Sequence, residues 1–137
     1  MATGRALAGY RWCVASIRIF GTIKNLDRIT KRLGIKPSHT HRKGETASRF
    51  ANYRHHGWVL TAAVRRDRKL SEHLRWLQRR LRRKENYLRR LTRQYDVDLY
   101  CSYHSNYDQG QLEFPTEILA WCTKVGMPIR VSILVQD

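Results

Sequence analysis

The residues with the clearest potential for chemistry are the arginines of segment 70–95. Between Arg65 and Arg93 the chain has thirteen Lys and Arg residues but only three acidic ones. Guanidinium groups bind phosphate oxygens through several N–H donors, and a one-signed cluster of them is typical of nucleic-acid-binding proteins. Such contacts position a nucleic acid without reading its bases. We therefore expect phosphate contacts, with a solvated helix face as the alternative, at Arg75, Arg79, Arg82, Arg83, Arg89, Arg90 and Arg93.

Two further groups could extend this surface. The basic segment 36–56 has no regular hydrophobic period, so it is expected to be a long loop that contributes Arg42, Lys43 and Arg54. A sheet face with basic and aromatic residues would offer Arg18, Tyr100 and Arg130. RNA is favoured over DNA because no helix-turn-helix pattern is evident and because aromatic rings are available for stacking on bases: Tyr53, Trp58, Tyr100 and Tyr107.

Catalysis would need a different set of side chains. His39, His41 and Lys43 form the one cluster that could act as base and acid on RNA without a metal ion. No nucleophile motif, carboxylate pair or phosphate-binding glycine loop accompanies them. Zinc is not expected, because the loop histidines neighbour Arg42 and Lys43 and the cysteines lie in apolar stretches. The chain is therefore predicted to be a non-enzyme without a cofactor or metal.

Composition sets the class of protein. The 137 residues are 42% hydrophobic, enough for one folded domain spanning 1–137, and the formal net charge is +16. An excess of this size repels itself, so a polyanionic partner is expected. Three cysteines without paired spacing indicate reduced thiols, and neither a membrane span nor a signal peptide is evident. A cytoplasmic protein that does not engage a membrane is expected, with its oligomeric state open.

The elements that must position these residues follow from hydrophobic periodicity. Alternating residues predict strands at 11–20, 58–64, 97–104 and 128–135. Helical spacing predicts helices at 25–34, 70–95 and 115–125. The fold class is therefore α+β: a single sheet of about four strands, mostly antiparallel or mixed, with three to four helices packed on one face.

Leucines show that the arginine-rich segment also folds. Leu70, Leu74, Leu77 and Leu81 keep helical spacing, as do Leu88 and Leu91, so one face of this segment is expected to join the core. Lys84 occupies the apolar position between the two groups. We therefore expect a break or kink near 84–86, and whether 70–95 is one helix or two stays open.

Several short motifs resemble the bacterial family known as domain of unknown function 4279. They are Ser16-x-Arg18-Ile19-x-Gly21, Leu33-Gly34-x-x-Pro37-Ser38, Arg42-Lys43-Gly44-Glu45, a strand led by Trp58, and Asp98-Leu99-Tyr100-Cys101. The resemblance covers roughly residues 12–135 and implies no established activity, only a loose association with small accessory or immunity-like proteins. Members of the family resemble this chain less in 70–95, where they are mixed or acidic and carry a proline. The arginines of this chain therefore indicate that this member binds a polyanionic partner of its own.

Three functions are therefore considered. The first is an RNA-binding accessory or regulatory protein of a ribonucleoprotein. The second is an immunity or inhibitor protein whose basic face binds an acidic partner such as a toxin or nuclease. The third is a metal-independent ribonuclease.

Overall fold

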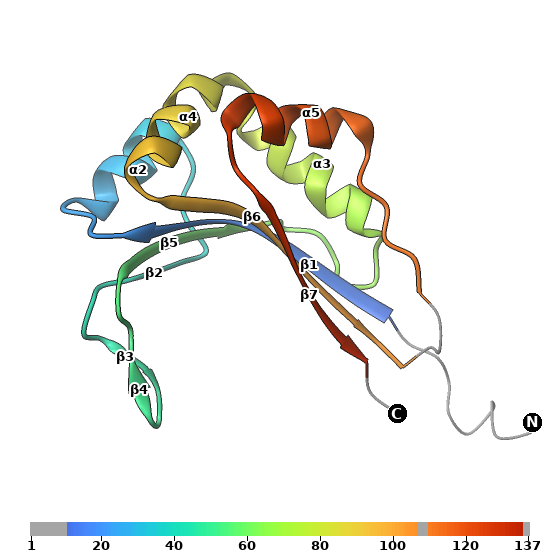
Figure 1. Cartoon of the computed structure of the whole chain (residues 1–137), viewed down its shortest axis with the longest axis horizontal. Coiled ribbons are helices and arrows are strands. Elements are labelled where there is room, and N and C mark those ends of the chain that lie inside the picture. The colour runs from blue at the N-terminus through green and yellow to red at the C-terminus, as the bar shows by residue number, and fades with distance from the viewer. Residues whose placement is uncertain (1–10, 107–109, 136–137) are drawn as a thin grey trace, which may run out of the picture.

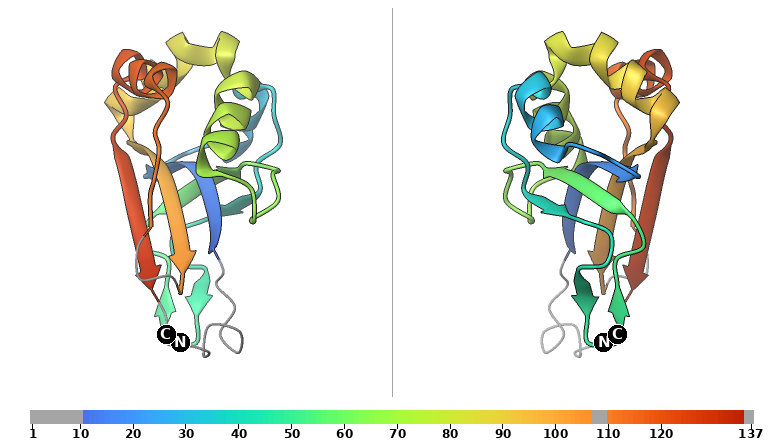
Figure 2. Two further views of the ribbon diagram at one scale, coloured as in Figure 1. Left: turned by 90° about the vertical axis from the view of Figure 1, so that its right-hand side faces the viewer. Right: turned by 90° about the vertical axis from the view of Figure 1, so that its left-hand side faces the viewer.

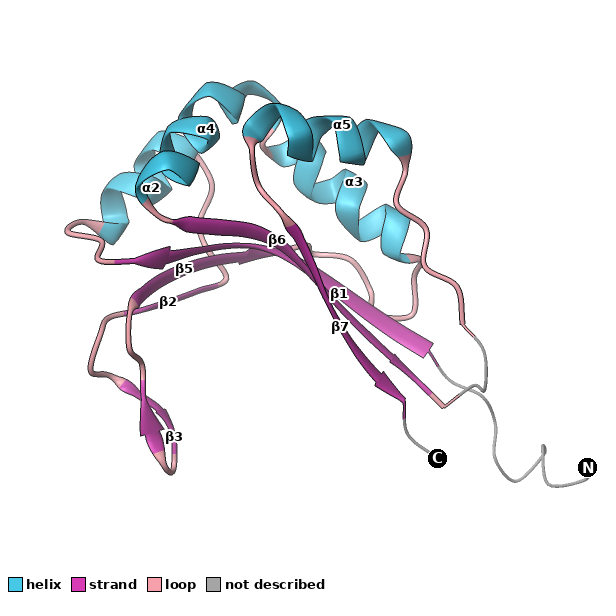
Figure 3. Cartoon of the chain, in the orientation of Figure 1, coloured by secondary structure: helices cyan, strands magenta, loops and turns pink. Residues whose placement is uncertain are grey.

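A twisted mixed sheet forms one layer of the molecule and helices cover one face of it (Figures 1 and 3). The computed structural model describes residues 11–106 and 110–135. The strand order of the main sheet is β2-β5-β1-β6-β7. The strands are β1 (Arg11–Gly21), β2 (His39–His41), β5 (His56–Thr61), β6 (Asp96–Ser105) and β7 (Ile129–Val135). The predicted α+β class is confirmed, with five strands in this sheet in place of about four.

The additional strands lie in the segment that was expected to be a loop. Residues 36–56 contain β2 and a small two-stranded sheet of β3 (Thr46–Ser48) and β4 (Ala51–Asn52). These strands have two or three residues, too few to leave an alternating hydrophobic pattern. The β3–β4 hairpin projects from the side of the sheet opposite to the helices (Figure 2). The prediction of an irregular basic loop was therefore wrong for β2, β3 and β4, and the residues between these strands are turns and loops.

Four α-helices occur in the described part of the chain: α2 (Leu26–Leu33), α3 (Leu70–Arg80), α4 (Glu85–Gln94) and α5 (Thr116–Val125). Helix α2 begins where Asn25 Oδ1 accepts a hydrogen bond from the Arg28 amide at 3.1 Å, and it ends at Gly34 in the left-handed conformation. A 3₁₀ turn, η1 (Arg82–Lys84), separates α3 from α4. The predicted break near Lys84 is thereby confirmed.

This break lets both leucine groups reach the core. Leu77, Leu81 and Leu88 are all fully buried, although position 84 between them carries a lysine. A straight helix would have carried Lys84 along the same buried face. The turn at η1 instead redirects the chain, so the lysine stays only half-buried while the leucines on either side pack inward.

Strand β1 forms the middle of the sheet. Cys13, Ala15, Ile17 and Ile19 alternate toward the helices and are at most 1% exposed, as their alternation predicted. Neighbours β5 and β6 pair with β1 in antiparallel fashion, whereas β7 pairs with β6 in parallel. The side chains on the opposite face of β1, including Arg18, therefore point to the side without helices.

The outermost strand β7 departs from the expected pattern. Ile129, Val131, Ile133 and Val135 were expected on the core face, yet Ile133 is 60% exposed and Val135 is 59% exposed. The helices do not extend over this part of the sheet (Figure 1). An edge strand with one neighbour buries less of both faces than a central strand does.

The cysteines are core residues. Cys13, Cys101 and Cys122 are reduced and buried, as their apolar surroundings predicted. Burial raises the pKa of Cys101 to about 12 and that of Cys122 to about 11, so both are protonated at neutral pH. Among the described helices, none is both long and apolar enough to cross a membrane.

Candidate nucleic-acid interface

Five of the seven predicted helical arginines lie on the outer surface of α3, η1 and α4. All five are exposed, while the leucines of the same segment face the core. We call this group the helical cation surface: Arg79, Arg82, Arg83, Arg90 and Arg93. The same segment therefore packs its leucines into the hydrophobic core and presents a basic surface to the solvent.

The acidic residues of this stretch are engaged elsewhere. Asp67 pairs with Arg65 at 2.5 Å, and Glu72 pairs with Arg68 at 2.9 Å. Glu85 binds Lys124 of α5 at 2.9 Å. Within the described residues, no carboxylate forms an ion pair with any member of the helical cation surface. Its charge is therefore not neutralised within the fold.

The other two helical arginines have structural partners in α5. Arg75 Nε donates to Glu117 Oε1 at 3.0 Å, and this contact helps to lower the pKa of the Glu117 carboxyl group, after the effect of its own backbone amide. Arg89 Nε donates to the carbonyl of Lys124 at 3.0 Å. Both side chains fasten α5 to the α3–α4 pair, so they are less available to a ligand than the sequence indicated.

The cations of segment 36–56 do not continue the helical cation surface. Arg42, Lys43 and Arg54 are exposed at the base of the β3–β4 hairpin. That hairpin lies on the opposite side of the sheet from the helices (Figures 1 and 2). Between the two groups lies the end of the sheet, where His55 and Arg93 line one hollow.

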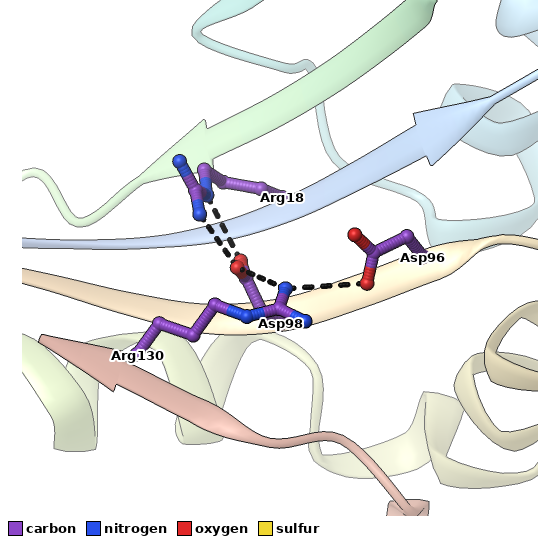
Figure 4. Close-up of polar contacts among 4 residues, drawn as sticks. All are labelled: Arg18, Asp96, Asp98 and Arg130. Carbon is purple, nitrogen blue, oxygen red and sulfur yellow. Dashed lines mark hydrogen bonds and ion pairs between the residues drawn. The ribbon is translucent and has the colours of Figure 1, made fainter.

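The three predicted sheet-face residues do meet, but around a cluster of ion pairs, of which Figure 4 shows Arg18, Arg130, Asp96 and Asp98. Arg18 donates to both oxygens of Asp98, at 2.9 and 2.6 Å, and its guanidinium lies 3.9 Å from the centre of the Tyr100 ring. Arg130 Nη1 donates to Asp98 at 2.8 Å and to Asp96 at 3.2 Å. Two arginines and two aspartates leave no net charge in this cluster, so it is a poor anion site.

The two histidines that were predicted to form a cluster, His39 and His41, also lie close together in the structure. His39 Nε2 and His41 Nδ1 are 3.1 Å apart, and the His41 ring stacks on Tyr53 with ring centres 3.5 Å apart. Burial lowers the pKa of His41, and the neighbouring His39 lowers it further. Lys43 is exposed in the following turn. In residues 11–106 and 110–135, no cluster of three or more His, Cys, Asp or Glu could hold a metal ion.

The aromatic residues expected to stack on bases are mostly occupied. Trp58 is fully buried, and its indole nitrogen donates to Thr30 at 3.0 Å. Tyr53 is covered by His41, and Tyr100 lies under Arg18. Tyr107 lies outside the described residues. All three described rings are therefore less available to stack on a base than the sequence indicated.

The residues that sequence reasoning missed line a cleft between α2 and α4. This cleft has a volume of about 400 Å³ and brings Lys24, Arg28 and Arg32 opposite Arg90 and Tyr87. The polar side of α2 carries Arg28, Lys31 and Arg32, which was the signal available in the sequence. Sequence periodicity cannot say which helix lies beside which, so the cleft could not be predicted.

The motif residues have structural explanations in this chain. Arg18 of the first motif pairs with Asp98 of the last, and Gly34 ends α2 in a left-handed conformation. Ser38 Oγ accepts a hydrogen bond from the Thr61 amide at 2.9 Å, which fastens the chain before β2 to β5. Arg18, Gly34, Ser38 and Asp98 of these motifs therefore have roles in the fold.

Comparison with known proteins agrees with the expectation from these motifs. The family described as "Domain of unknown function (DUF4279)" matches residues 10–136. No curated protein and no solved structure matches the chain.

Proposed function

Since the chain belongs to the DUF4279 family, whose function is unknown, we propose a function from its own geometry: it is a non-enzymatic RNA-binding protein that holds the phosphate backbone on its helical cation surface. This role is that of an accessory or regulatory subunit of a ribonucleoprotein. The proposal rests on one observation, which is the absence of acidic partners for five exposed arginines in the described part of the chain.

Like charges on neighbouring helix positions destabilise a helix by a few tenths of a kcal/mol per pair, roughly. A protein that served only its own stability would place its acids among these arginines. Here the three acids of the segment pair with Arg65, Arg68 and Lys124 instead. An external polyanion is the natural source of the missing negative charge.

The position of α4 favours backbone contacts over reading of bases. The helix lies between α2, with which it forms the cleft, and α5, which it contacts through Arg89 and Glu85. A recognition helix must project to enter the major groove of a duplex. A helix flanked on both sides presents a strip of side chains instead, which suits the phosphates of a strand that passes across it.

The arrangement of the histidines supports a binding role rather than catalysis. His39 and His41 lie within hydrogen-bond distance of each other, and His41 is buried against Tyr53. A base and an acid for RNA cleavage must each reach the substrate. A buried His41 that is stacked on one ring and bonded to another serves to hold the hairpin against the sheet.

The decisive experiment is the salt dependence of binding to a fluorescent single-stranded RNA of twelve nucleotides. Each phosphate contact on a single strand contributes about −0.7 to the slope of log K against log salt, so five arginines predict about −3.5. The variant Arg82→Gln/Arg83→Gln should reduce this slope to about −2.1. Fluorescence polarisation measures both values.

The matched control is Arg65→Gln/Arg68→Gln. It removes the same charge from arginines that already have carboxylate partners, so the slope should stay near that of the wild type. An equal change in both variants, or a wild-type slope near zero, would refute phosphate binding by the helical cation surface. Retention of one protein from a nuclease-treated lysate at high salt, without RNA binding, would favour the inhibitor function instead.

A further inference from the structure

The cleft between α2 and α4 collects cations from two elements that are distant in sequence. Lys24, Arg28 and Arg32 lie on the α2 side, and Arg90 lies on α4. No Asp or Glu is found among the described residues that line it. The concentration of positive charge in a concave space makes its potential stronger than that of a flat surface with the same charges.

Aromatic contacts hold two of these cations in place. The guanidinium carbon of Arg32 lies 4.9 Å from the centre of the Tyr87 ring, and that of Arg90 lies 5.7 Å from it. A cation held by a ring face keeps its N–H donors, whereas a carboxylate would occupy them. Tyr87 thus brings an arginine from each helix to one place while leaving both able to bind an anion.

The rest of the cleft is suited to a flat apolar group. Ile23, Ile29 and Leu91 lie in its lining and are at most 3% exposed, so they form the floor. Tyr95 lies at the end of the cleft beside Gly21, where an added Cβ would approach its ring to 3.0 Å. The volume of about 400 Å³ lies within the range of small-ligand sites. An inorganic anion would leave the floor and the Tyr95 ring without a partner.

We propose that the α2–α4 cleft binds a nucleoside phosphate unit of single-stranded RNA, with the phosphate on Arg28, Arg32 and Arg90 and the base against Tyr95. This inference rests on the proposed function for the remainder of the strand, which crosses the helical cation surface through the shared residue Arg90. A base can enter the cleft only when it is unpaired, so the site selects single strands over duplexes.

A neighbouring hollow extends the path of the strand. It is lined by Phe20, His55 and Arg93, and it shares Gln94 and Tyr95 with the cleft. The strand can therefore pass around the end of α4 with Arg93 as its next phosphate contact. The hollow also contains Asp96, which makes it less basic than the cleft itself.

The test compares a cleft variant on α2 with a charge-matched control at Lys31 of α2 and Lys36 just after it. Arg28→Gln/Arg32→Gln removes two cations from the cleft, and Lys31→Gln/Lys36→Gln removes two that do not line it. The cleft variant should weaken binding of a twelve-nucleotide oligouridylate about tenfold and should leave a twelve-base-pair RNA duplex almost unchanged. The control should change both affinities by less than about twofold. Equal losses in the two variants, or equal losses for oligouridylate and duplex, overturn the proposal.

Titration with uridine monophosphate separates the cleft from the helical cation surface. Saturable shifts of the Tyr87 and Tyr95 ring resonances, lost in Arg28→Gln/Arg32→Gln, support the cleft site even if oligouridylate does not bind. In that event the helical cation surface is refuted and the ligand is a free nucleotide. Oligouridylate binding that only Arg82→Gln/Arg83→Gln weakens, without shifts on either ring, overturns the cleft and retains the proposed function.

Discussion

The ion-pair cluster on the open face of the sheet predicts a graded series of stability losses. Asp98 is 1% exposed and accepts three hydrogen bonds, two from Arg18 and one from Arg130. In Asp98→Asn the negative charge disappears while both guanidiniums remain. The buried amide can still accept from Arg18, but its NH₂ group has no acceptor in this arrangement.

The magnitude follows from burial. Removal of one partner of a fully buried ion pair costs about 3–5 kcal/mol. Here Arg18 is 25% exposed and Arg130 is 46% exposed, so both can recover some hydration. We therefore expect Asp98→Asn to lower the free energy of unfolding by about 2–3 kcal/mol. Arg130→Gln should cost about 0.5–1 kcal/mol, because Asp98 keeps both bonds to Arg18. Asp96→Asn should have almost no effect, because Asp96 is 57% exposed.

Urea denaturation followed by circular dichroism measures all three variants under identical conditions. The reasoning is refuted if Asp98→Asn costs less than about 0.5 kcal/mol, or if Asp96→Asn costs as much as Asp98→Asn. The same series also addresses function. If the cluster is structural, Arg130→Gln leaves the affinity for single-stranded RNA unchanged, whereas a large loss of affinity would make the sheet face part of the interface.

Two further predictions concern histidines. In Gly57→Ala the new Cβ would overlap the His41 ring, so we expect a loss of about 1–3 kcal/mol on urea denaturation and faster amide exchange in the β3–β4 hairpin; unchanged exchange would contradict the role of His41 in holding it. Burial lowers the pKa of His73, so the unfolded chain binds a proton at this residue more tightly than the folded chain does. The contribution of His73 to the free energy of unfolding is therefore fully present above the ordinary histidine pKa of about 6.5, and the free energy of unfolding falls as the pH drops below that value. His73→Met should flatten the pH dependence of the urea midpoint between about pH 7 and 5, and equal profiles for wild type and His73→Met would refute this.

The sequence predicted a helix or strand correctly wherever the residues that define the element lie close together in the chain. The alternation of β1, the cap at Asn25 and the end at Gly34 all depend on residues a few positions apart, and each agrees with the structure. The break near Lys84 was also readable, because a charged residue cannot occupy a buried position between Leu81 and Leu88 without a partner. Strands of two or three residues carry no such signal, and the hairpin was therefore missed.

The candidate site depends on distances between different helices and strands, and the spacing of residues along the chain does not give these distances. Arg75 and Arg89 looked equivalent to Arg82 and Arg83 in the chain, but the first two donate hydrogen bonds to residues of α5, whereas the others lie exposed on η1. Arg18 and Arg130 looked like free cations until the sheet register placed them next to Asp98. Which charges are neutralised depends on contacts between elements, so it could not be read from composition.

The sequence by itself determined the large cationic excess, the core-facing leucines and the class of fold, because these depend on composition and short-range periodicity. Only the tertiary structure decided where the excess is concentrated. The packing of α2 beside α4 brings Arg28 and Arg32 to Tyr87 and Arg90 across more than fifty residues of chain. A cleft exists only between surfaces, and the relative position of two helices is set by how the whole core is filled.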